Sequence, residues 1–173
     1  VGRVPAMLNF SAGVGNMTSA LKTAEVNVLL TSKAFVDAGE LHDTIDVLSQ
    51  HTKVVWLEDV KASIGLFDKL GAVVFSTFSA RAWHRGFVKD PERPAAVLFT
   101  SGSEGTPKGV VLSHDNLLAN RYQLAARIEF NPTDIVFNAL PVFHSFGLTS
   151  GLLLPVLAGV RTFLYPSPLH YRV

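Results

Sequence analysis

The chain has 173 residues, a length that fits one domain or part of a larger one. Its 15 Lys and Arg residues balance 14 Asp and Glu residues to a formal net charge of +1. We expect no nucleic-acid partner, because so balanced a charge provides no strong positive field for a polyanion. The absence of cysteine excludes disulfides, thiolate metal sites and a cysteine nucleophile, and 48% hydrophobic residues exclude a disordered chain.

The hydrophobic content is high for a domain that stands alone, with a mean hydropathy of +0.30. The longest apolar run, 147–160, contains Pro155 and is shorter than the roughly 20 residues that cross a bilayer, so it indicates a buried helix. The sequence shows no signal peptide, and it starts at Val1 without a methionine. We therefore expect a fragment whose apolar surface is covered in a larger protein.

The first half of the chain alternates between helical and extended patterns. Apolar residues at helical spacing predict helices, and short runs rich in β-branched residues predict strands. The predicted elements are a helix at 16–25, a strand at 26–30, a helix at 41–49, a strand at 53–57 and a helix at 64–70. The aromatic-rich stretch 73–83 is compatible with a helix or a strand, and Pro91 and Pro94 mark a linker at 89–94.

The second half continues this alternation. The predicted elements are a strand at 95–100, an extended segment at 110–112, a helix from Asp115 to about Phe130 with Ser113 as N-cap, a strand at 135–140, a helix at 147–158 and a strand at 160–165. Strand–helix alternation predicts an α/β fold with a mostly parallel sheet flanked by helices. The linker divides this domain into two subregions, 1–88 and 95–173.

The strongest chemical signal is the loop at 100–109, which directly follows the predicted strand at 95–100. Its glycines allow backbone amides to approach an anion closely, and its hydroxyl groups and lysine add donors and positive charge. We predict a polyphosphate-binding site, formed by Thr100, Ser101, Gly102, Ser103, Gly105, Thr106 and Lys108.

Two other phosphate-binding motifs do not fit this loop. A P-loop NTPase would need Gly at position 107 and Ser or Thr at 109, where the chain has Pro107 and Gly109. The G-x-G-x-x-G fingerprint of dinucleotide-binding folds does not occur. A solvated surface loop is the structural alternative, and a nucleotide-responsive or partner-binding module without catalytic activity is the functional one.

Two motifs resemble a known family. The loop TSGSEGTPKGV resembles the signature loop of the adenylate-forming superfamily of acyl- and aryl-CoA synthetases, and LPVFHSFG at 140–147 is similar to its next core motif. Stretches at 4–13, 56–61 and 163–172 resemble the acyl-(acyl carrier protein) synthetase half of the bacterial bifunctional 2-acylglycerophosphoethanolamine acyltransferases. The resemblance implies part of the large N-terminal domain of an AMP-binding ligase.

The chemistry implied by this resemblance starts with a fatty acid carboxylate that attacks the α-phosphorus of ATP. A thiol of acyl carrier protein or CoA then takes the acyl group, and a lysophospholipid is the final acceptor. ATP and Mg²⁺ are the implied cofactors, and the implied location is the cytoplasmic side of the bacterial inner membrane. An acyl-CoA or aryl-CoA synthetase is the alternative branch of the family.

The resemblance also implies roles for residues of the second motif. His144 would lie near the reacting carboxylate, and Phe143, Phe146 and Gly147 would line an acyl channel. A core histidine is the structural alternative for His144, and core packing is the alternative to a fatty acid tunnel for the apolar segment at 147–160.

Several parts of the implied enzyme have no counterpart in these residues. They are the acyltransferase half, the C-terminal lid domain with its catalytic lysine, the adenine pocket and the magnesium ligand. We assign no metal ligand, and we expect the 173-residue chain alone to form no acyl-adenylate.

Overall fold

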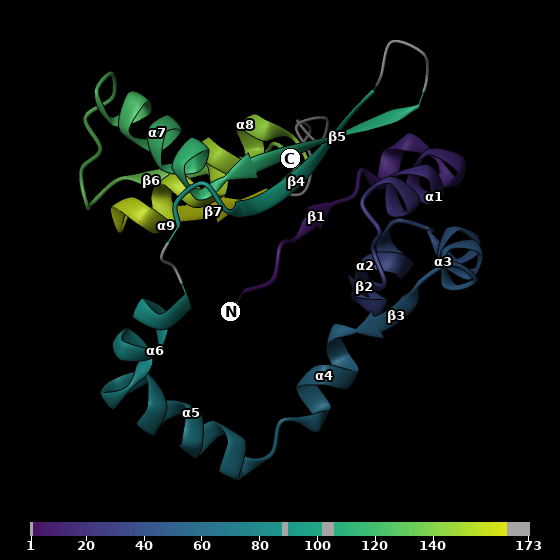
Figure 1. Cartoon of the computed structure of the whole chain (residues 1–173), viewed down its shortest axis with the longest axis horizontal. Helices are drawn as coiled ribbons and strands as arrows, with labels where there is room; N and C mark the ends of the chain where they lie inside the picture. The colour runs from purple at the N-terminus through teal and green to yellow at the C-terminus, as the bar shows by residue number, and fades with distance from the viewer. Residues whose placement is uncertain (1, 88–89, 102–105, 166–173) are drawn as a thin grey trace. The chain divides into compact units, whose positions relative to one another are not determined.

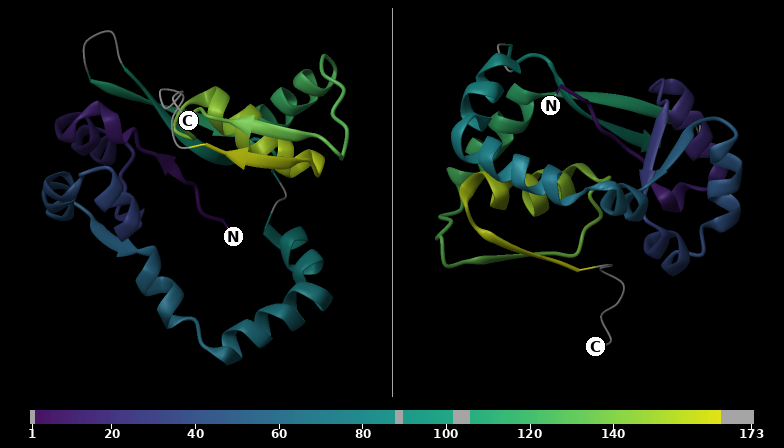
Figure 2. Two further views of the ribbon diagram at one scale, coloured as in Figure 1. Left: turned by 180° about the vertical axis from the view of Figure 1, so that it is seen from behind. Right: turned by 90° about the horizontal axis from the view of Figure 1, so that it is seen from below.

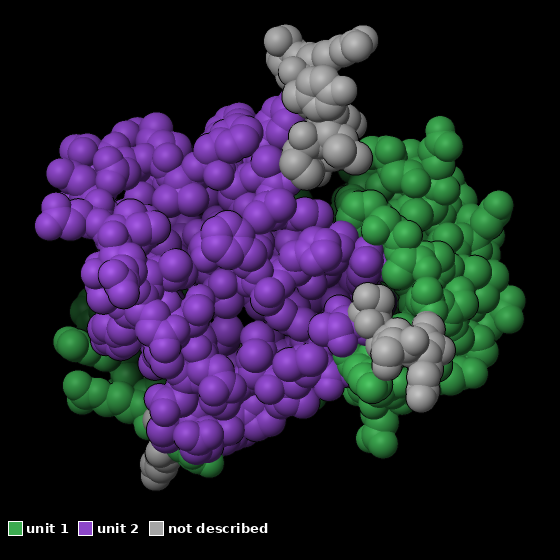
Figure 3. Space-filling view, turned by 90° about the horizontal axis from the view of Figure 1, so that it is seen from above, with its two compact units in different colours: residues 1–3, 10–90, 101–108 green, residues 4–9, 91–100, 109–173 purple. Residues whose placement is uncertain are grey.

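Two compact units make up the chain (Figure 3). The computed structural model describes residues 2–87, 90–101 and 106–165. Residues 1–3, 10–90 and 101–108 form unit 1, and residues 4–9, 91–100 and 109–173 form unit 2. Each unit therefore combines segments from distant parts of the sequence.

Unit 1 begins with a small α/β motif (Figure 1). Its elements are η1 (Phe10–Ala12), α1 (Val14–Thr23), β2 (Val28–Thr31), α2 (Lys33–Ala38), α3 (His42–Ser49) and β3 (Lys53–Trp56). The strands pair in parallel, with Val28 opposite Lys53 and Thr31 opposite Trp56. Its core consists of side chains from the three α-helices, namely Met17, Ala20, Leu21, Val36, Ile45 and Leu48. The helices and strands expected here are confirmed with small shifts at their ends, and α2 is an additional helix.

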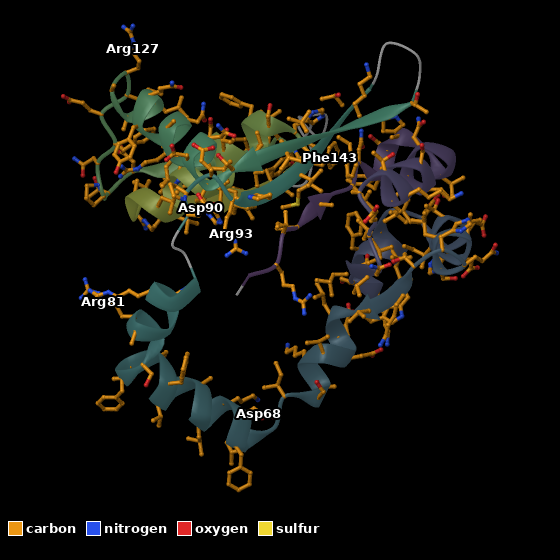
Figure 4. The ribbon with its side chains drawn as sticks, in the orientation of Figure 1. Asp68, Arg81, Asp90, Arg93, Arg127 and Phe143 are labelled. Atoms are coloured by element: carbon orange, nitrogen blue, oxygen red, sulfur yellow. The ribbon has the colours of Figure 1, made fainter. Side chains whose placement is uncertain are left out.

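Three consecutive helices complete unit 1, namely α4 (Leu57–Ser63), α5 (Leu66–Phe78) and α6 (Ala80–Phe87). The carboxylate of Asp68, labelled in Figure 4, accepts the N–H of Gly65 at 2.8 Å and so caps the start of α5. The ambiguous stretch 73–83 is thus helical, and the helix expected at 64–70 continues to Phe78. Phe67 and Phe78 are 88% and 82% exposed, because apolar residues occupy more than one side of α5. This distribution obscured the helical periodicity.

The carboxylate of Glu58 connects the first turn of α4 to the first turn of α2. The backbone N–H of Lys33 donates to Glu58 Oε2 at 3.0 Å, and the hydroxyl of Ser32 donates to Oε1 at 2.8 Å. Hydrogen bonds donated to a carboxylate favour its charged form. These bonds, with that from the Lys33 backbone the largest cause, lower the pKa of Glu58 from 4.5 to about 2.

We expect Glu58→Gln to reduce the acid sensitivity of the folded chain. The unfolded chain takes up this proton near pH 4.5, whereas the folded chain takes it up only near pH 2. The stabilisation from ionised Glu58 is therefore present above pH 4.5 and is lost as the pH falls toward 2. Urea unfolding across this interval should show a steeper loss of stability for the wild type than for the variant. Parallel curves would contradict this expectation.

Three strands form the sheet that carries the predicted phosphate loop: β1 (Ala6–Met7), β4 (Pro94–Ser101) and β5 (Pro107–Ser113). They are hydrogen-bonded in the order β1-β4-β5, and β1 runs parallel to β4 with Ala6 opposite Val97. β4 and β5 form a hairpin (Figures 1 and 2), because so short a connection joins only antiparallel strands. Lys108 and Gly109 lie within β5, so the expected loop at 100–109 is shorter than predicted.

Helix α7 (His114–Ala125) follows β5 directly. Ser113 is its N-cap, as predicted: its Oγ accepts the N–H of Asn116 at 3.1 Å, and Asn116 Oδ1 accepts the N–H of Ser113 at 3.0 Å. The helix ends before the expected Phe130. Ile128 and Phe130 have left the helix and line a cavity of unit 2, which gives these apolar side chains another packing environment.

The remainder of unit 2 is a second parallel strand pair with a helical segment between its strands. The elements are β6 (Ile135–Asn138), α8 (Ser145–Leu148), the π-helical turn η2 (Thr149–Leu153), α9 (Leu154–Ala158) and β7 (Arg161–Leu164). Ile135 lies opposite Arg161, and Asn138 lies opposite Leu164. The helix expected at 147–158 is confirmed, with a π-helical turn in its middle.

Leu148 of this helical segment packs with Ala96 and Leu98 of β4 in the core of unit 2. Leu154 is also buried, at 3% exposure. The apolar run at 147–160 therefore contributes to the core, which was the structural alternative considered for this segment. None of the helices within residues 2–87, 90–101 and 106–165 combines the length and apolar character needed to span a bilayer. The α/β fold with parallel strands is confirmed.

Candidate functional site

The predicted phosphate loop lies where β4 ends and β5 begins. Thr100 and Ser101 are the last two residues of β4, Thr106 directly precedes β5, and Lys108 is its second residue. The remaining predicted loop residues, Gly102, Ser103 and Gly105, lie outside the described residues. The structure therefore places Thr100 and Ser101 at the end of β4 and Thr106 directly before the start of β5.

The described side chains of this hairpin end are open to solvent. Thr100, Thr106 and Lys108 are all exposed. Within residues 2–87, 90–101 and 106–165, no carboxylate forms an ion pair with Lys108. Exposed ammonium and hydroxyl groups suit an anionic ligand, because a phosphate can accept hydrogen bonds from donors of both kinds.

His144 lies in a tight turn between β6 and α8. Its N–H donates to the carbonyl of Pro141 at 3.1 Å, and its own carbonyl accepts the N–H of Leu148 at 2.9 Å. The backbone of His144 is extended, at φ −89° and ψ 141°, and forms the N-cap of α8. Its side chain is exposed, so His144 is not the buried core histidine of the structural alternative.

Two cavities flank the helical segment that follows His144. The first has a volume of about 360 Å³ and lies between α7 and the α8–η2 segment. The second has a volume of about 330 Å³ and is lined mainly by apolar side chains of β6, η2 and the segment after α7. Ser150 and Phe146 line both cavities, and Phe146 is 61% exposed.

The three residues assigned to an acyl channel thus have different environments. Phe146 faces the two cavities, whereas neither Phe143 nor Gly147 is among their lining residues. The ring of Phe143, labelled in Figure 4, lies 4.9 Å from that of His144 between centroids, at an interplanar angle of 44°. Gly147 is buried against the Pro141 carbonyl.

Asn138 is a buried polar residue that sequence reasoning missed. It is the last residue of β6 and only 6% exposed. Its Oδ1 accepts the N–H of Leu140 at 3.0 Å, and its Nδ2 lies 3.5 Å from the carbonyl oxygen of Gly147. The available signal was an amide side chain at the end of an apolar strand, two residues before the start of the LPVFHSFG motif.

Comparison with models of protein families identifies the family of this chain. The model for AMP-binding enzymes matches residues 1–172, which include the hairpin end and the His144 turn. The chain belongs to the AMP-binding enzyme family. The family resemblance drawn from TSGSEGTPKGV and LPVFHSFG is therefore confirmed.

Two curated ligases illustrate how much of an AMP-binding enzyme this chain represents. It is 44% identical over 70 residues to the medium-chain fatty-acid–CoA ligase of Escherichia coli (strain K12), which is 40% of this chain and 12% of that protein. It is 27% identical over 169 residues to the acyl-CoA ligase sidI of Beauveria bassiana (strain ARSEF 2860), which is 96% of this chain and 29% of that protein. The chain spans less than a third of either relative.

Solved structures show the same fold. ATP-bound MatB from Rhodopseudomonas palustris matches with a TM-score of 0.68 and 22% identity, over 95% of this chain and 30% of that one. The o-succinylbenzoate CoA synthetase MenE from Bacillus subtilis matches with a TM-score of 0.69 and 18% identity, over 95% of this chain and 37% of that one. Both matches support a partial α/β domain of an AMP-binding enzyme.

Proposed function

We propose that this chain forms part of an ATP-dependent ligase that joins a fatty acid to a thiol through an acyl-adenylate. A carboxylate oxygen forms a bond to the α-phosphorus of ATP, and the bond from that phosphorus to pyrophosphate breaks. The thiol sulfur then bonds to the acyl carbon, AMP leaves with the bridging oxygen, and the thiol releases its proton. The observation that carries this proposal is the hydroxyl- and lysine-bearing hairpin end at Thr100–Lys108 in a member of this family.

The hairpin end would bind the β- and γ-phosphates of ATP. Hydroxyl groups of Thr100, Ser101 and Thr106 would donate hydrogen bonds to phosphate oxygens, and the Lys108 ammonium would neutralise charge on them. Such a transfer needs positioning and charge stabilisation more than covalent participation of the protein. The structures of ATP-bound MatB and of MenE with an acyl-adenylate support a nucleotide ligand for this fold.

We assign no Mg²⁺ ligand to the described residues. Within residues 2–87, 90–101 and 106–165, no group of three His, Asp or Glu side chains is arranged to hold a metal ion. The phosphate contacts proposed for the hairpin end use hydroxyl and ammonium groups only.

His144 and the neighbouring cavities would serve the acyl part of the substrate. We assign the exposed imidazole of His144 to the reacting carboxylate and the subsequent thioester transfer. The apolar chain would lie along Phe146, because the two cavities beside Phe146 offer apolar walls for it, whereas Phe143 and Gly147 line neither cavity. A fatty acid is the proposed substrate because its apolar chain suits such walls, and the substrate named for the E. coli relative supports this choice.

For the thiol acceptor we propose the phosphopantetheine of acyl carrier protein. The stretches at 4–13, 56–61 and 163–172 favour this branch, in which the acyl group passes to a lysophospholipid at the cytoplasmic face of a bacterial inner membrane. CoA is the second candidate, because the related proteins named above are CoA ligases. Parallel assays with equal concentrations of acyl carrier protein and CoA distinguish the two.

We expect Lys108→Ala to lower fatty-acid-dependent exchange of labelled pyrophosphate into ATP by about 10- to 100-fold, because one charge-assisted hydrogen bond contributes about 1.5–3 kcal/mol. The assay uses the whole ligase that contains this chain. Lys69→Ala is the matched control, because Lys69 is an exposed lysine of α5 remote in sequence from the loop. If the folded ligase binds ATP but catalyses no pyrophosphate exchange whichever fatty or aryl acid is supplied, this result would instead indicate the non-catalytic nucleotide-binding module.

A further inference from the structure

The turn that presents His144 is attached to the end of β6 through one buried side chain. Asn138 Oδ1 accepts the Leu140 N–H at 3.0 Å, directly before the turn, and its Nδ2 faces the Gly147 carbonyl at 3.5 Å, in the helix α8 that follows the turn. The carboxamide therefore lies between the two ends of the segment that carries the imidazole. Because Asn138 is 6% exposed, water cannot readily replace these contacts.

Close packing reinforces this attachment. A Cβ atom on Gly147 would lie 2.2 Å from the Pro141 carbonyl oxygen, and one on Gly151 would lie 2.2 Å from Asn138 Cγ. The start of α8 thus touches the turn itself, and η2 touches the Asn138 side chain. A methyl group at either glycine could be accommodated only by a displacement of the turn or of the carboxamide.

We propose that Asn138 is a positioning residue for His144 in the ligase reaction. Its carboxamide fixes both ends of the 140–147 segment, so that the exposed imidazole has a defined place although no described side chain donates to it or accepts from it. This inference depends on the proposed function, in which His144 acts on the acyl group. A misplacement of about 1 Å at a reacting centre can cost about 100-fold in rate, so such a support is expected to affect turnover.

The test compares Asn138→Ala with Thr162→Val in the whole ligase. Thr162 Oγ1 donates toward the carbonyls of Gly151 at 3.1 Å and Val136 at 3.2 Å, so it also connects η2 to the strands, but it has no bond to the His144 turn. We expect Asn138→Ala to lower kcat about tenfold and to leave KM for ATP within about twofold. Thr162→Val should lower Tm and leave kcat unchanged. Equal loss of kcat in both variants would reduce Asn138 to a structural role and overturn the proposal.

A double variant tests whether the effect passes through His144. In a His144→Ala background, Asn138→Ala should cause no further loss of kcat, because the group that it positions is gone. An undiminished tenfold loss in that background would overturn the proposal. If Asn138→Ala does not fold, Asn138→Ser takes its place. The serine side chain keeps a small polar group in the buried site but is too short to accept the Leu140 N–H as Asn138 does.

A structural readout separates this inference from the proposed function. In Asn138→Ala we expect faster hydrogen exchange at the Leu140 amide and a changed NMR signal of the His144 ring. If His144→Ala leaves kcat unchanged, the catalytic role proposed for His144 is wrong. In that case the exchange rate of the Leu140 amide and the His144 ring signal alone decide whether Asn138 positions the turn. An unchanged Leu140 amide and an unchanged His144 ring signal would overturn the positioning role whatever the activity.

Discussion

Gly147→Ala is expected to destabilise the folded chain by about 3 kcal/mol or more, the largest effect of any single methyl group that we predict. The new Cβ would lie 2.2 Å from the carbonyl oxygen of Pro141, 2.9 Å from its carbonyl carbon and 3.0 Å from the carbonyl oxygen of Leu140. All three atoms belong to the backbone, so no side-chain rotation relieves the overlap. The Pro141 carbonyl also accepts the N–H of His144 at 3.1 Å, and its displacement would break this bond.

The matched control for this prediction is Gly71→Ala in α5. A Cβ at Gly71 would meet no atom within 4 Å. Alanine in place of a helical glycine usually stabilises by roughly 0.5–1 kcal/mol, so this variant should unfold at a higher urea concentration than the wild type. The two substitutions are chemically identical, and their opposite expected signs isolate the close approach at Gly147. Equal unfolding midpoints for both variants would show that the Pro141 turn moves freely.

The parts of the fold that sequence predicted are those in which local physics decides. Ser113 directly precedes a helical pattern, and the side chain of Ser113 accepts the Asn116 N–H as a capping residue should. The strand before the phosphate loop is likewise a short apolar run followed by glycine and hydroxyl residues, and it is found as β4. Both features are visible in the local sequence, although β4 also pairs with the distant β1.

The features that sequence missed depend on distant contacts. Glu58 is an ordinary acidic residue of a first helical turn until folding brings the Ser32 hydroxyl and the Lys33 N–H to its carboxylate. Lys108 was placed in a loop because its neighbours are loop formers, but pairing between β4 and β5 extends the strand through it. Tertiary pairing overrides local propensity in such cases.

The candidate site shows the same division. The residue types of the loop and of the LPVFHSFG motif indicated phosphate and acyl chemistry, and the family comparison bears out that resemblance. The support of His144 by Asn138 was not predictable, because it requires β6 and η2 to meet in space. A glycine within an apolar helix carries no visible signal of such a contact.

Gly151→Ala is expected to destabilise the chain by about 2–3 kcal/mol, through a clash of a different kind. The new Cβ would lie 2.2 Å from Asn138 Cγ, 2.3 Å from Nδ2 and 2.4 Å from Oδ1. The obstacle is a buried side chain instead of backbone, so it can be removed by mutation. Urea unfolding of Gly151→Ala, measured beside the Gly71→Ala control, gives the cost of the clash.

A double-mutant cycle with Asn138→Ala then tests the origin of that cost. Shortening Asn138 removes all three atoms that the Gly151→Ala methyl group would meet, so the double variant should be more stable than the sum of the single losses predicts. Gly147→Ala combined with Asn138→Ala should show no such recovery, because its obstacle is the backbone of Leu140 and Pro141. If the losses of stability for Gly151→Ala and Asn138→Ala are additive, η2 does not pack against the Asn138 carboxamide as described. Recovery for Gly151→Ala without recovery for Gly147→Ala would establish that η2 packs directly against the Asn138 carboxamide at the end of β6.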